Sequence, residues 1–193
     1  MEVVIINYGA GNIKSLEFAF KRLGVQASLS NEPEVILSAD KVIFPGVGEA
    51  SSAMHMLKVS RLDQLIPTLK QPVLGICLGM QLLCNHSEEG DTTGLGIFDV
   101  NIKRFNQDQK VPQMGWNTIN GLKSPLFNNI TEGEFMYLVH SYYAEDCEHS
   151  IASTTYGVSY ASAMHNQNFY GVQFHPEKSS HAGAQVLKNF IEL

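Results

Sequence analysis

Two short segments of the sequence contain the residue types that a covalent acyl-transfer reaction needs. Cys77 stands between Gly75 and Gly79 in the pattern Gly-x-Cys-x-Gly. Near the other end of the chain, His175 and Glu177 flank a proline. A thiol becomes an effective nucleophile when a base takes its proton and a carboxylate orients that base. The two segments together predict a cysteine nucleophile served by a His–Glu pair.

The element that must position Cys77 is a sharp turn from strand to helix. Residues 72–76 form a short apolar run typical of a buried strand, and residues 78–83 carry leucines at helical spacing. No loop separates them, so the pattern predicts a nucleophile elbow with a strained backbone at Cys77 and glycines beside it for space. A helix N-terminus also favours a thiolate. The alternative is that Cys77 is a small buried apolar residue.

The second segment must present two side chains to the same cleft. His175 and Glu177 are two residues apart, and in extended backbone such residues project to the same side. Pro176 fixes its own φ and disfavours helix at His175. One alternative is a surface histidine beside a salt-bridging glutamate. Another is a pair of metal ligands, but no third and fourth ligand follow at a recognisable spacing, so we expect no metal.

The composition limits the protein classes to consider. The chain has 193 residues, 44% of them hydrophobic and 17% charged, which predicts one soluble globular domain over residues 1–193. A net charge of −6 without a basic run indicates neither nucleic acid nor a membrane surface as partner. Three cysteines without a disulfide pattern favour a reducing, cytoplasmic compartment. We recognise neither a signal peptide nor an apolar run of the ~20 residues that a membrane span needs.

The first half of the chain alternates strand and helix patterns, which indicates a parallel sheet with right-handed crossovers. From Gly96 onward the helical periodicity is lost until the C-terminus, and an antiparallel β portion is expected. The predicted fold is therefore α/β, an open, mostly parallel sheet flanked by helices with an additional antiparallel portion in the C-terminal half. The expected strands are 3–6, 25–29, 41–45, 72–76, 100–102, 116–119, 135–143, 151–156, 158–164 and 169–174; the expected helices are 13–23, 33–39, 50–69 divided near Pro67, 78–83, and a last one capped by Ser179 or Ser180.

Three loops could border a ligand site. Residues 45–48 follow a strand, and their two glycines allow a backbone N–H to point toward an oxyanion, although a plain glycine turn fits equally. The glycines at 8–12 invite comparison with a dinucleotide-binding loop, but Lys14 replaces the third glycine, and a tight turn is the better interpretation. Residues 86–91 are acidic and read by default as a solvated loop.

The motifs around Cys77 and His175 resemble those of the class I, or triad, glutamine amidotransferases. Five further stretches, 7–12, 45–48, 114–117, 139–142 and 175–180, are similar to the glutaminase subunits of imidazole glycerol phosphate synthases. The resemblance implies that Cys77 attacks the carboxamide of glutamine, that His175 moves the proton and that Glu177 holds the imidazole. It implies backbone oxyanion donors at Val47 and Leu78, no cofactor, and a glutamine-binding set of Gly46, Gly48, Gln81, Glu89, Ser141 and Tyr142.

The same resemblance implies a partner. Ammonia must be delivered out of contact with water, and all of the chain is accounted for by the glutaminase, so a separate (β/α)₈-barrel cyclase is expected. That complex would make imidazole glycerol phosphate and aminoimidazole carboxamide ribotide in histidine biosynthesis. The positions that match the interface are Asn12, Met114, Trp116 and Lys178. Trp116 has the alternative of being a core aromatic.

Other functions remain open at the level of the sequence. Gln113 stands where many members have histidine, and related glutaminases supply ammonia to surface-sugar pathways with a similar barrel. A cysteine hydrolase or peptidase of similar fold would need neither a partner nor Gln81. A non-catalytic binding module would not need an intact Cys77, His175 and Glu177.

Overall fold

The strands and helices of the first half follow the alternation that the sequence predicts. The computed structural model describes residues 1–9 and 11–193; Ala10, within the predicted turn at 7–12, lies outside the described residues. The elements are β1 (Val3–Ile6), α1 (Ile13–Arg22), β2 (Ala27–Ser30), α2 (Pro33–Ser38), β3 (Lys41–Phe44), α3 (Ala50–Val59), α4 (Leu62–Leu65), the 3₁₀ helix η1 (Ile66–Thr68), β4 (Val73–Ile76) and α5 (Leu78–Leu82).

The second half consists mainly of strands and ends in a helix. Its elements are β5 (Cys84–Ser87), β6 (Thr92–Thr93), β7 (Phe98–Arg104), β8 (Gln113–Ile119), the 3₁₀ helix η2 (Pro125–Phe127), β9 (Glu134–His140), β10 (Tyr142–Ala144), β11 (Ser150–Tyr156), β12 (Val158–Asn166), β13 (Phe169–Val172), the 3₁₀ helix η3 (Pro176–Lys178) and α6 (Ser180–Glu192).

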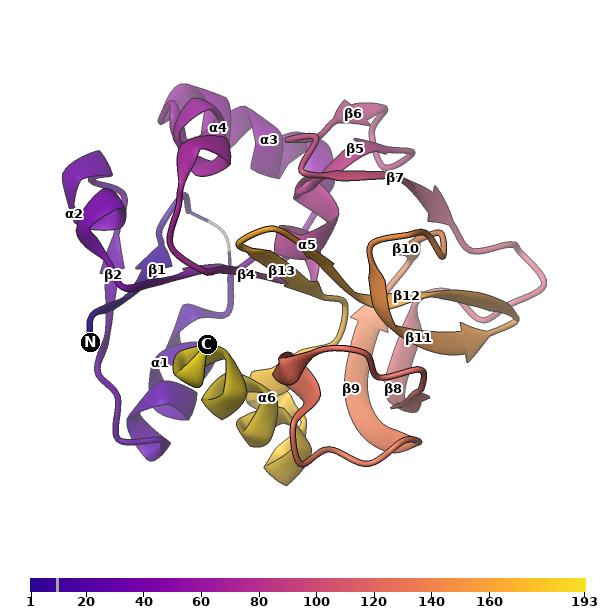
Figure 1. The fold of residues 1–193 in the computed structure, drawn as a ribbon. Coiled ribbons are helices and arrows are strands. Elements are labelled where there is room, and N and C mark those ends of the chain that lie inside the picture. Colours follow the sequence, from indigo (N-terminus) through magenta and orange to yellow (C-terminus); the bar gives the residue numbers. More distant parts are fainter. Residues whose placement is uncertain (10) are drawn as a thin grey trace.

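One long sheet runs through the molecule, as Figure 1 shows. Strands β2, β1, β3, β4 and β13 lie side by side in parallel, and antiparallel strands β12, β10 and β7 continue the same sheet beyond β13. Strands β8 and β9 form a separate antiparallel pair, which we call the β8–β9 ribbon. The predicted α/β fold is confirmed, and the antiparallel portion is largely an extension of the parallel sheet.

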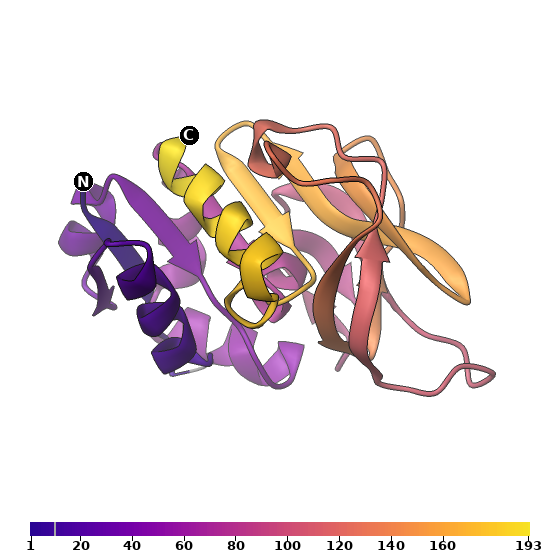
Figure 2. The same cartoon turned by 90° about the horizontal axis from the view of Figure 1, so that it is seen from below.

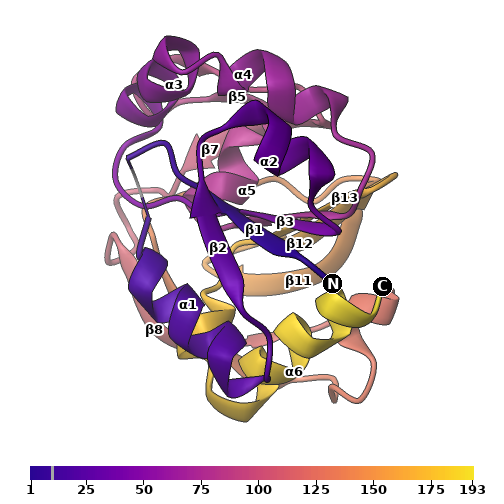
Figure 3. The same cartoon turned by 90° about the vertical axis from the view of Figure 1, so that its left-hand side faces the viewer.

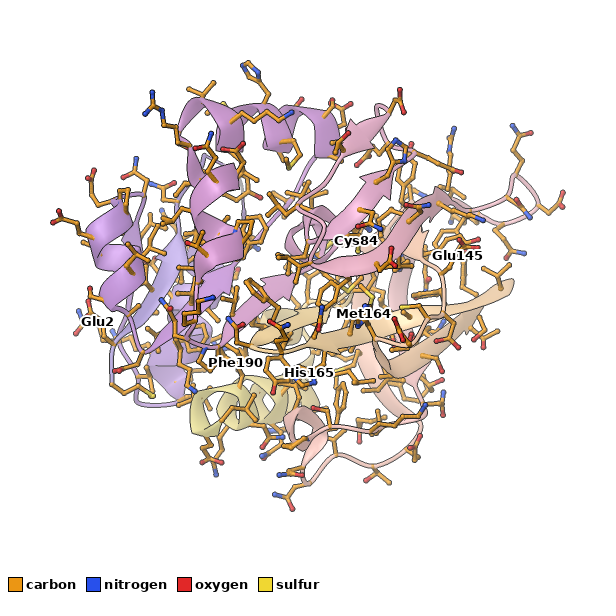
Figure 4. The ribbon with its side chains drawn as sticks, turned by 45° about the horizontal axis from the view of Figure 1, so that its top comes forward. Glu2, Cys84, Glu145, Met164, His165 and Phe190 are labelled. Atoms are coloured by element: carbon orange, nitrogen blue, oxygen red, sulfur yellow. The ribbon has the colours of Figure 1, made fainter. Side chains whose placement is uncertain are left out.

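Two hydrophobic cores cover the two faces of this sheet. Successive residues of β1 alternate between them, because neighbouring side chains of a strand point to opposite faces. Helices α2, α3 and α4 lie over one face, while α1 and α6 lie over the other beside the β8–β9 ribbon (Figures 2 and 3). Side chains fill these layers in Figure 4, where Cys84 and Met164 belong to the first core and Phe190 to the second.

Several boundaries differ from the predictions: β7 and β8 are longer than expected, β13 ends at Val172, and β5 and β6 were not expected. The predicted helix 50–69 is divided near Pro67 as expected, because α4 ends at Leu65 and Pro67 lies in η1, but it is also interrupted at Arg61, which adopts a left-handed φ of 58°. The strand predicted at 135–143 is divided at Ser141. The predicted loop 86–91 begins later, because residues 86 and 87 belong to β5.

The last helix begins where the sequence predicts, but without a capping hydrogen bond from the serine side chain. Ser179 is the N-cap residue of α6, yet its hydroxyl makes no capping hydrogen bond. That hydroxyl donates to the carbonyl of His175 at 2.7 Å and accepts from the N–H of Tyr137 at 2.9 Å. Ser179 therefore connects the His175 backbone to the β8–β9 ribbon. No helix among the described residues has the length and apolarity that crossing a bilayer requires.

Candidate active site

Cys77 lies at the turn between β4 and α5 with a strained backbone, φ 53° and ψ −112°. A Cβ atom on Gly75 would lie 2.8 Å from a methyl carbon of Leu83 and 2.9 Å from the backbone nitrogen of Met80. A Cβ atom on Gly79 would overlap with the carbonyl oxygen of Phe44. Only glycine therefore fits on either side of the cysteine, as the nucleophile-elbow pattern predicts.

Strand β13 brings the C-terminal motif beside the elbow. It runs parallel to β4, and the N–H of Cys77 donates to the carbonyl of Val172 at 2.8 Å. Just beyond the strand, the N–H of His175 donates to the carbonyl of Tyr137 at 2.9 Å, which ties His175 to the β8–β9 ribbon. Residues about one hundred positions apart in sequence are thus neighbours because two parallel strands end at the same edge of the sheet.

His175 and Glu177 form a buried pair. Nδ1 of His175 lies 2.9 Å from Oε1 of Glu177, and the two side chains are 3% and 2% exposed. Burial by itself lowers the pKa of His175, but the neighbouring Cys77 and Glu177 side chains raise it more strongly, to about 10. Nε2 of His175 has no hydrogen-bond partner among the described residues. The geometry thus favours an imidazolium with one N–H free to serve the cleft.

The cleft in front of Cys77 has a volume of about 290 Å³ and brings most of the predicted site together. Gly46 and Glu177 do not line it: Gly46 packs behind the loop, and Glu177 lies behind His175. The lining residues are Val47, Gly48, Cys77, Leu78, Gln81, Glu89, Pro112, Val139, His140, Ser141, Tyr142 and His175.

The glycine segment at 45–48 is fixed at one end and open at the other. A Cβ atom on Gly46 would lie 2.6 Å from the backbone nitrogen of Gly79, so the segment packs directly on the elbow. The hydroxyl of Tyr8 donates to the carbonyl of Pro45 at 2.8 Å. Gly48 has a φ of 97° and nothing within 4 Å of the position where a Cβ would be. The segment therefore has open space on the Cβ side of Gly48, the glycine that lines the cleft.

Glu89 is half-buried rather than solvated as the acidic-loop interpretation supposed. Its Oε2 accepts from the N–H of Ala50, at the start of α3, at 2.9 Å. Burial raises the pKa of its carboxyl group, the bond from Ala50 lowers it, and the charge of Glu49 raises it. One carboxylate oxygen thus holds a helix N-terminus, and the other is left for a ligand in the cleft.

His140 connects the wall at Ser141 and Tyr142 to the interior. Its Nδ1 lies 2.7 Å from the carbonyl oxygen of Tyr142, and its Nε2 lies 3.2 Å from the hydroxyl of Tyr160. Burial lowers the pKa of His140 to about 4, although the bond to Tyr142 opposes this. His140 is therefore neutral near pH 7, and Nδ1 donates because a carbonyl can only accept.

The residues predicted to meet a partner all lie at the surface, fully or partly exposed. Met114 is 66% exposed and Trp116 is 52% exposed, so Trp116 is not the core aromatic considered as its alternative. Trp116 meets Tyr137 edge to face at 6.0 Å, and the Nζ of Lys178 lies 5.9 Å from the centre of the Tyr137 ring. Asn12, at the start of α1, is partly exposed.

Sequence reasoning missed several residues around Cys77. The Sγ atom donates to the carbonyl of Val139 at 3.8 Å and accepts from Nε2 of Gln173 at 3.7 Å. The available signal was the two-residue spacing of Gln173 from His175. The backbone is extended at His175, but Glu177 lies in the 3₁₀ helix η3, so the extended backbone expected through residue 177 is wrong and the His175–Glu177 pair meets across a 3₁₀ turn. Tyr8 gave no signal, because its role depends on a fold contact. No cluster of potential metal ligands occurs among the described residues.

Comparisons with known proteins agree with this geometry. Residues 4–193 match the model of the family described as glutamine amidotransferase class-I. The chain is 55% identical over 196 residues to the imidazole glycerol phosphate synthase subunit HisH of Bacteroides fragilis (strain YCH46), and 46% identical over 196 residues to the protein of that name from Yersinia pseudotuberculosis, with 100% of each chain covered in both cases. Among solved structures, PurLQS from Thermotoga maritima is similar with a TM-score of 0.72 and 17% identity, over 99% of this chain and 97% of that one.

Proposed function

Because the chain belongs to the class I glutamine amidotransferase family, we propose that it is the glutaminase subunit of an imidazole glycerol phosphate synthase. It hydrolyses L-glutamine to glutamate and ammonia for histidine biosynthesis. The names of relatives at 46–55% identity support this pathway over surface-sugar amidination. The observation that carries the chemistry is the buried His175–Glu177 pair in the cleft that contains Cys77.

The triad gives each step of the hydrolysis a named group. The thiol proton of Cys77 passes to Nε2 of His175, which has no other partner among the described residues, and the resulting thiolate beside the imidazolium attacks the δ-carbon of glutamine. His175 then gives that proton to the departing ammonia, leaving a glutamyl thioester on Cys77. Water, deprotonated by His175, attacks the thioester and releases glutamate. Glu177, at 2.9 Å from Nδ1, holds the imidazole and stabilises its cationic form.

The cleft supplies contacts for the rest of the substrate. We assign the free oxygen of Glu89 to the α-ammonium of glutamine, since charge-assisted hydrogen bonds are the strong ones. Ser141 and Tyr142 line the opposite wall and receive the α-carboxylate, while Gln81 and Gly48 border the side chain. The backbone N–H groups of Val47 and Leu78 are the oxyanion donors. Gly46 does not line the cleft, so its proposed role is only to pack the 45–48 loop against the elbow.

The partner is proposed to be a (β/α)₈-barrel cyclase that docks on the face containing Met114, Trp116 and Lys178, with Asn12 at its edge. Two large apolar side chains exposed on one short strand favour such an interface, because interface centres are enriched in Trp and Met. The barrel receives ammonia and makes imidazole glycerol phosphate and aminoimidazole carboxamide ribotide. With Cys77 and two further free thiols, the complex is assigned to the cytoplasm.

The isolated chain is expected to hydrolyse glutamine slowly. The segment at 45–48 has an open end at Gly48, so its peptides can adopt an orientation with no oxyanion donor. Losing one such donor costs on the order of 10²–10³ in rate. A partner with its acceptor bound can recover this factor by favouring the competent orientation. A lone chain that turns over as fast as the ligand-bound complex would contradict this part of the proposal.

The test is the complex carrying Cys77→Ala. Glutamine-dependent synthesis should be lost while ammonia-dependent synthesis is retained, because only the glutaminase needs the thiol. Equal loss of both activities in an assembled complex would overturn the proposal. In single-turnover trapping, His175→Ala should block thioester formation and Glu177→Gln should reduce it less. A wild-type yield of thioester in His175→Ala would exclude His175 as the base.

A further inference from the structure

Gln173 is a buried polar residue that the triad mechanism does not use. Its side chain is inaccessible to solvent, and it lies between Gln81 of α5 and the sulfur of Cys77. Its Oε1 accepts from Nε2 of Gln81 at 2.8 Å, and its Nε2 donates to Sγ of Cys77 at 3.7 Å. A buried carboxamide needs partners at both ends, and one partner here is the reacting atom.

The orientation of this carboxamide is determined by its neighbours. The carbonyl of Tyr142 can only accept, so the group of Gln81 that lies 2.9 Å from it must be the NH₂ group. The second proton of that NH₂ points to Gln173, which must present its oxygen there. The NH₂ group of Gln173 is consequently left facing the sulfur. A backbone carbonyl thus sets the direction of the whole chain of hydrogen bonds.

This direction favours one ionisation state of Cys77. As a thiol, Cys77 donates its hydrogen to the carbonyl of Val139 at 3.8 Å. As a thiolate it can only accept, and an N–H that already points at the sulfur needs no reorganisation to bind it. His175 supplies charge from Nε2, whereas Gln173 supplies a neutral donor held in place by Gln81.

We propose that Gln173 is a catalytic residue of the glutaminase, whose carboxamide stabilises the Cys77 thiolate through an N–H···S hydrogen bond oriented by Gln81 and the Tyr142 carbonyl. The proposal rests on Cys77 being the nucleophile of the proposed function. It adds a donor to the triad at a residue that has no contact with the bulk solvent. The same bond holds the thiolate again each time the thioester is hydrolysed.

The test replaces Gln173 by methionine, which has a similar length and shape but no N–H donor. The rate of Cys77 alkylation by iodoacetamide is measured from pH 5 to pH 10 on the full chain, with mass spectrometry to separate Cys77 from Cys84 and Cys147. Alkylation of Cys77 at pH values below the midpoint of its profile should slow about tenfold, and the midpoint should move to higher pH. Gln113→Met is the matched control.

Gln113 is suited to this control because it is also a buried glutamine, 3% exposed, but accepts from Tyr160 at 2.9 Å and makes no hydrogen bond to the sulfur. The Gln113→Met profile should coincide with the wild type. A folded Gln173→Met chain with the wild-type profile, or equal shifts in both variants, would overturn the proposal. If Gln173→Met does not fold, Gln81→Met replaces it and should shift the profile in the same direction, because it releases the Gln173 carboxamide; no shift there would also refute the idea.

This measurement is separate from the test of the proposed function. Thiol titration needs neither glutamine nor a partner, so it can support the Gln173 bond even if the chain proves not to hydrolyse glutamine. Conversely, loss of glutamine-dependent synthesis in Cys77→Ala can support the glutaminase while the Gln173→Met profile remains unshifted.

Discussion

Two glycine-containing turns meet at the active site, and their glycines serve opposite purposes. At the elbow, Gly75 and Gly79 are enclosed by backbone atoms, so that any side chain would collide. In the neighbouring turn, Gly48 has open space on the side where a side chain would be. The first turn fixes the nucleophile, whereas the second packs tightly only at Gly46 and has room at Gly48 for the peptide reorientation proposed above. The difference shows that a glycine pattern in the sequence does not distinguish a sterically enclosed turn from one with open space.

Among the tests of this contrast, Gly79→Ala has the largest expected effect. The added methyl group would overlap with the carbonyl oxygen of Phe44, and neither atom can move by a simple rotamer change. The free energy of unfolding should fall by about 3 kcal/mol or more, as for severe overpacking. Chemical denaturation of wild type and variant measures it. A loss below about 1 kcal/mol would show that the elbow is not rigid.

A pH experiment tests His140, which supports the cleft wall that the elbow helix contacts through Gln81. The folded pKa of His140 is about 4, below its ordinary value, so the unfolded chain binds the extra proton between about pH 6.5 and pH 4. This contribution should therefore lower the free energy of unfolding by roughly 3 kcal/mol as the pH falls through that window. His140→Gln should flatten the slope in denaturant titrations at several pH values; an unchanged slope would show that His140 protonates without cost.

His175 contributes to the pH dependence of the free energy of unfolding with the opposite sign from His140, so the same titrations test both residues. Its folded pKa of about 10 lies above its ordinary value, so its contribution is complete below about pH 6.5 and is lost as the pH rises through 10. The same titrations should show His175→Ala flattening the alkaline limb and leaving the acidic limb intact. A change confined to the acidic limb would contradict the assignment.

The paired variants Gly46→Ala and Gly48→Ala test the two ends of the turn at 45–48 separately. Gly46→Ala should cost about 1–3 kcal/mol, because its methyl group meets the Gly79 backbone at 2.6 Å. Gly48→Ala meets no atom, and its φ of 97° should cost about 1–2 kcal/mol through backbone strain. Gly48→Ala should nevertheless disturb stimulation by the partner, measured as glutaminase rate with and without acceptor. Normal stimulation in a folded Gly48→Ala complex would argue against a moving peptide.

The smallest expected effect is at Tyr8, whose hydroxyl bonds to the turn at 45–48. Tyr8→Phe removes the buried bond to the Pro45 carbonyl while the ring can keep its place beside Phe44. The free energy of unfolding should fall by about 1 kcal/mol. Tyr156→Phe is the control, since it removes a bond of the same length, to the carbonyl of Lys110, at an exposed site. Equal losses of unfolding free energy in both variants would show that the Tyr8 bond stabilises the turn no more than an exposed bond would.

The sequence was sufficient wherever local chemistry decides the outcome. Gly75, Cys77 and Gly79 predict the elbow because the steric demand lies within five residues, and Pro176 predicts the extended entry at His175. It was not sufficient where a distant contact decides. Ser179 occupies the N-cap position of α6, but its hydroxyl bonds to the His175 carbonyl and not to the helix, and Gln173 acquires its sulfur contact only when β13 lies beside β4. Pro67 marks the division that proline chemistry predicts, whereas the additional interruption at the left-handed Arg61 was not predicted from the local sequence.

The β8–β9 ribbon has a consequence for engineering. Met114 and Trp116 point outward, whereas Gln113 and Ile119 of the same strand are buried. The ribbon touches the catalytic residues through main-chain carbonyls, those of Tyr137 and Val139, which no side-chain substitution removes. The outward positions of this proposed partner face can therefore be varied while the hydrogen bonds to His175 and Cys77 are kept. A library restricted to alternate positions of β8 would change the docking surface alone and leave the catalytic residues in place.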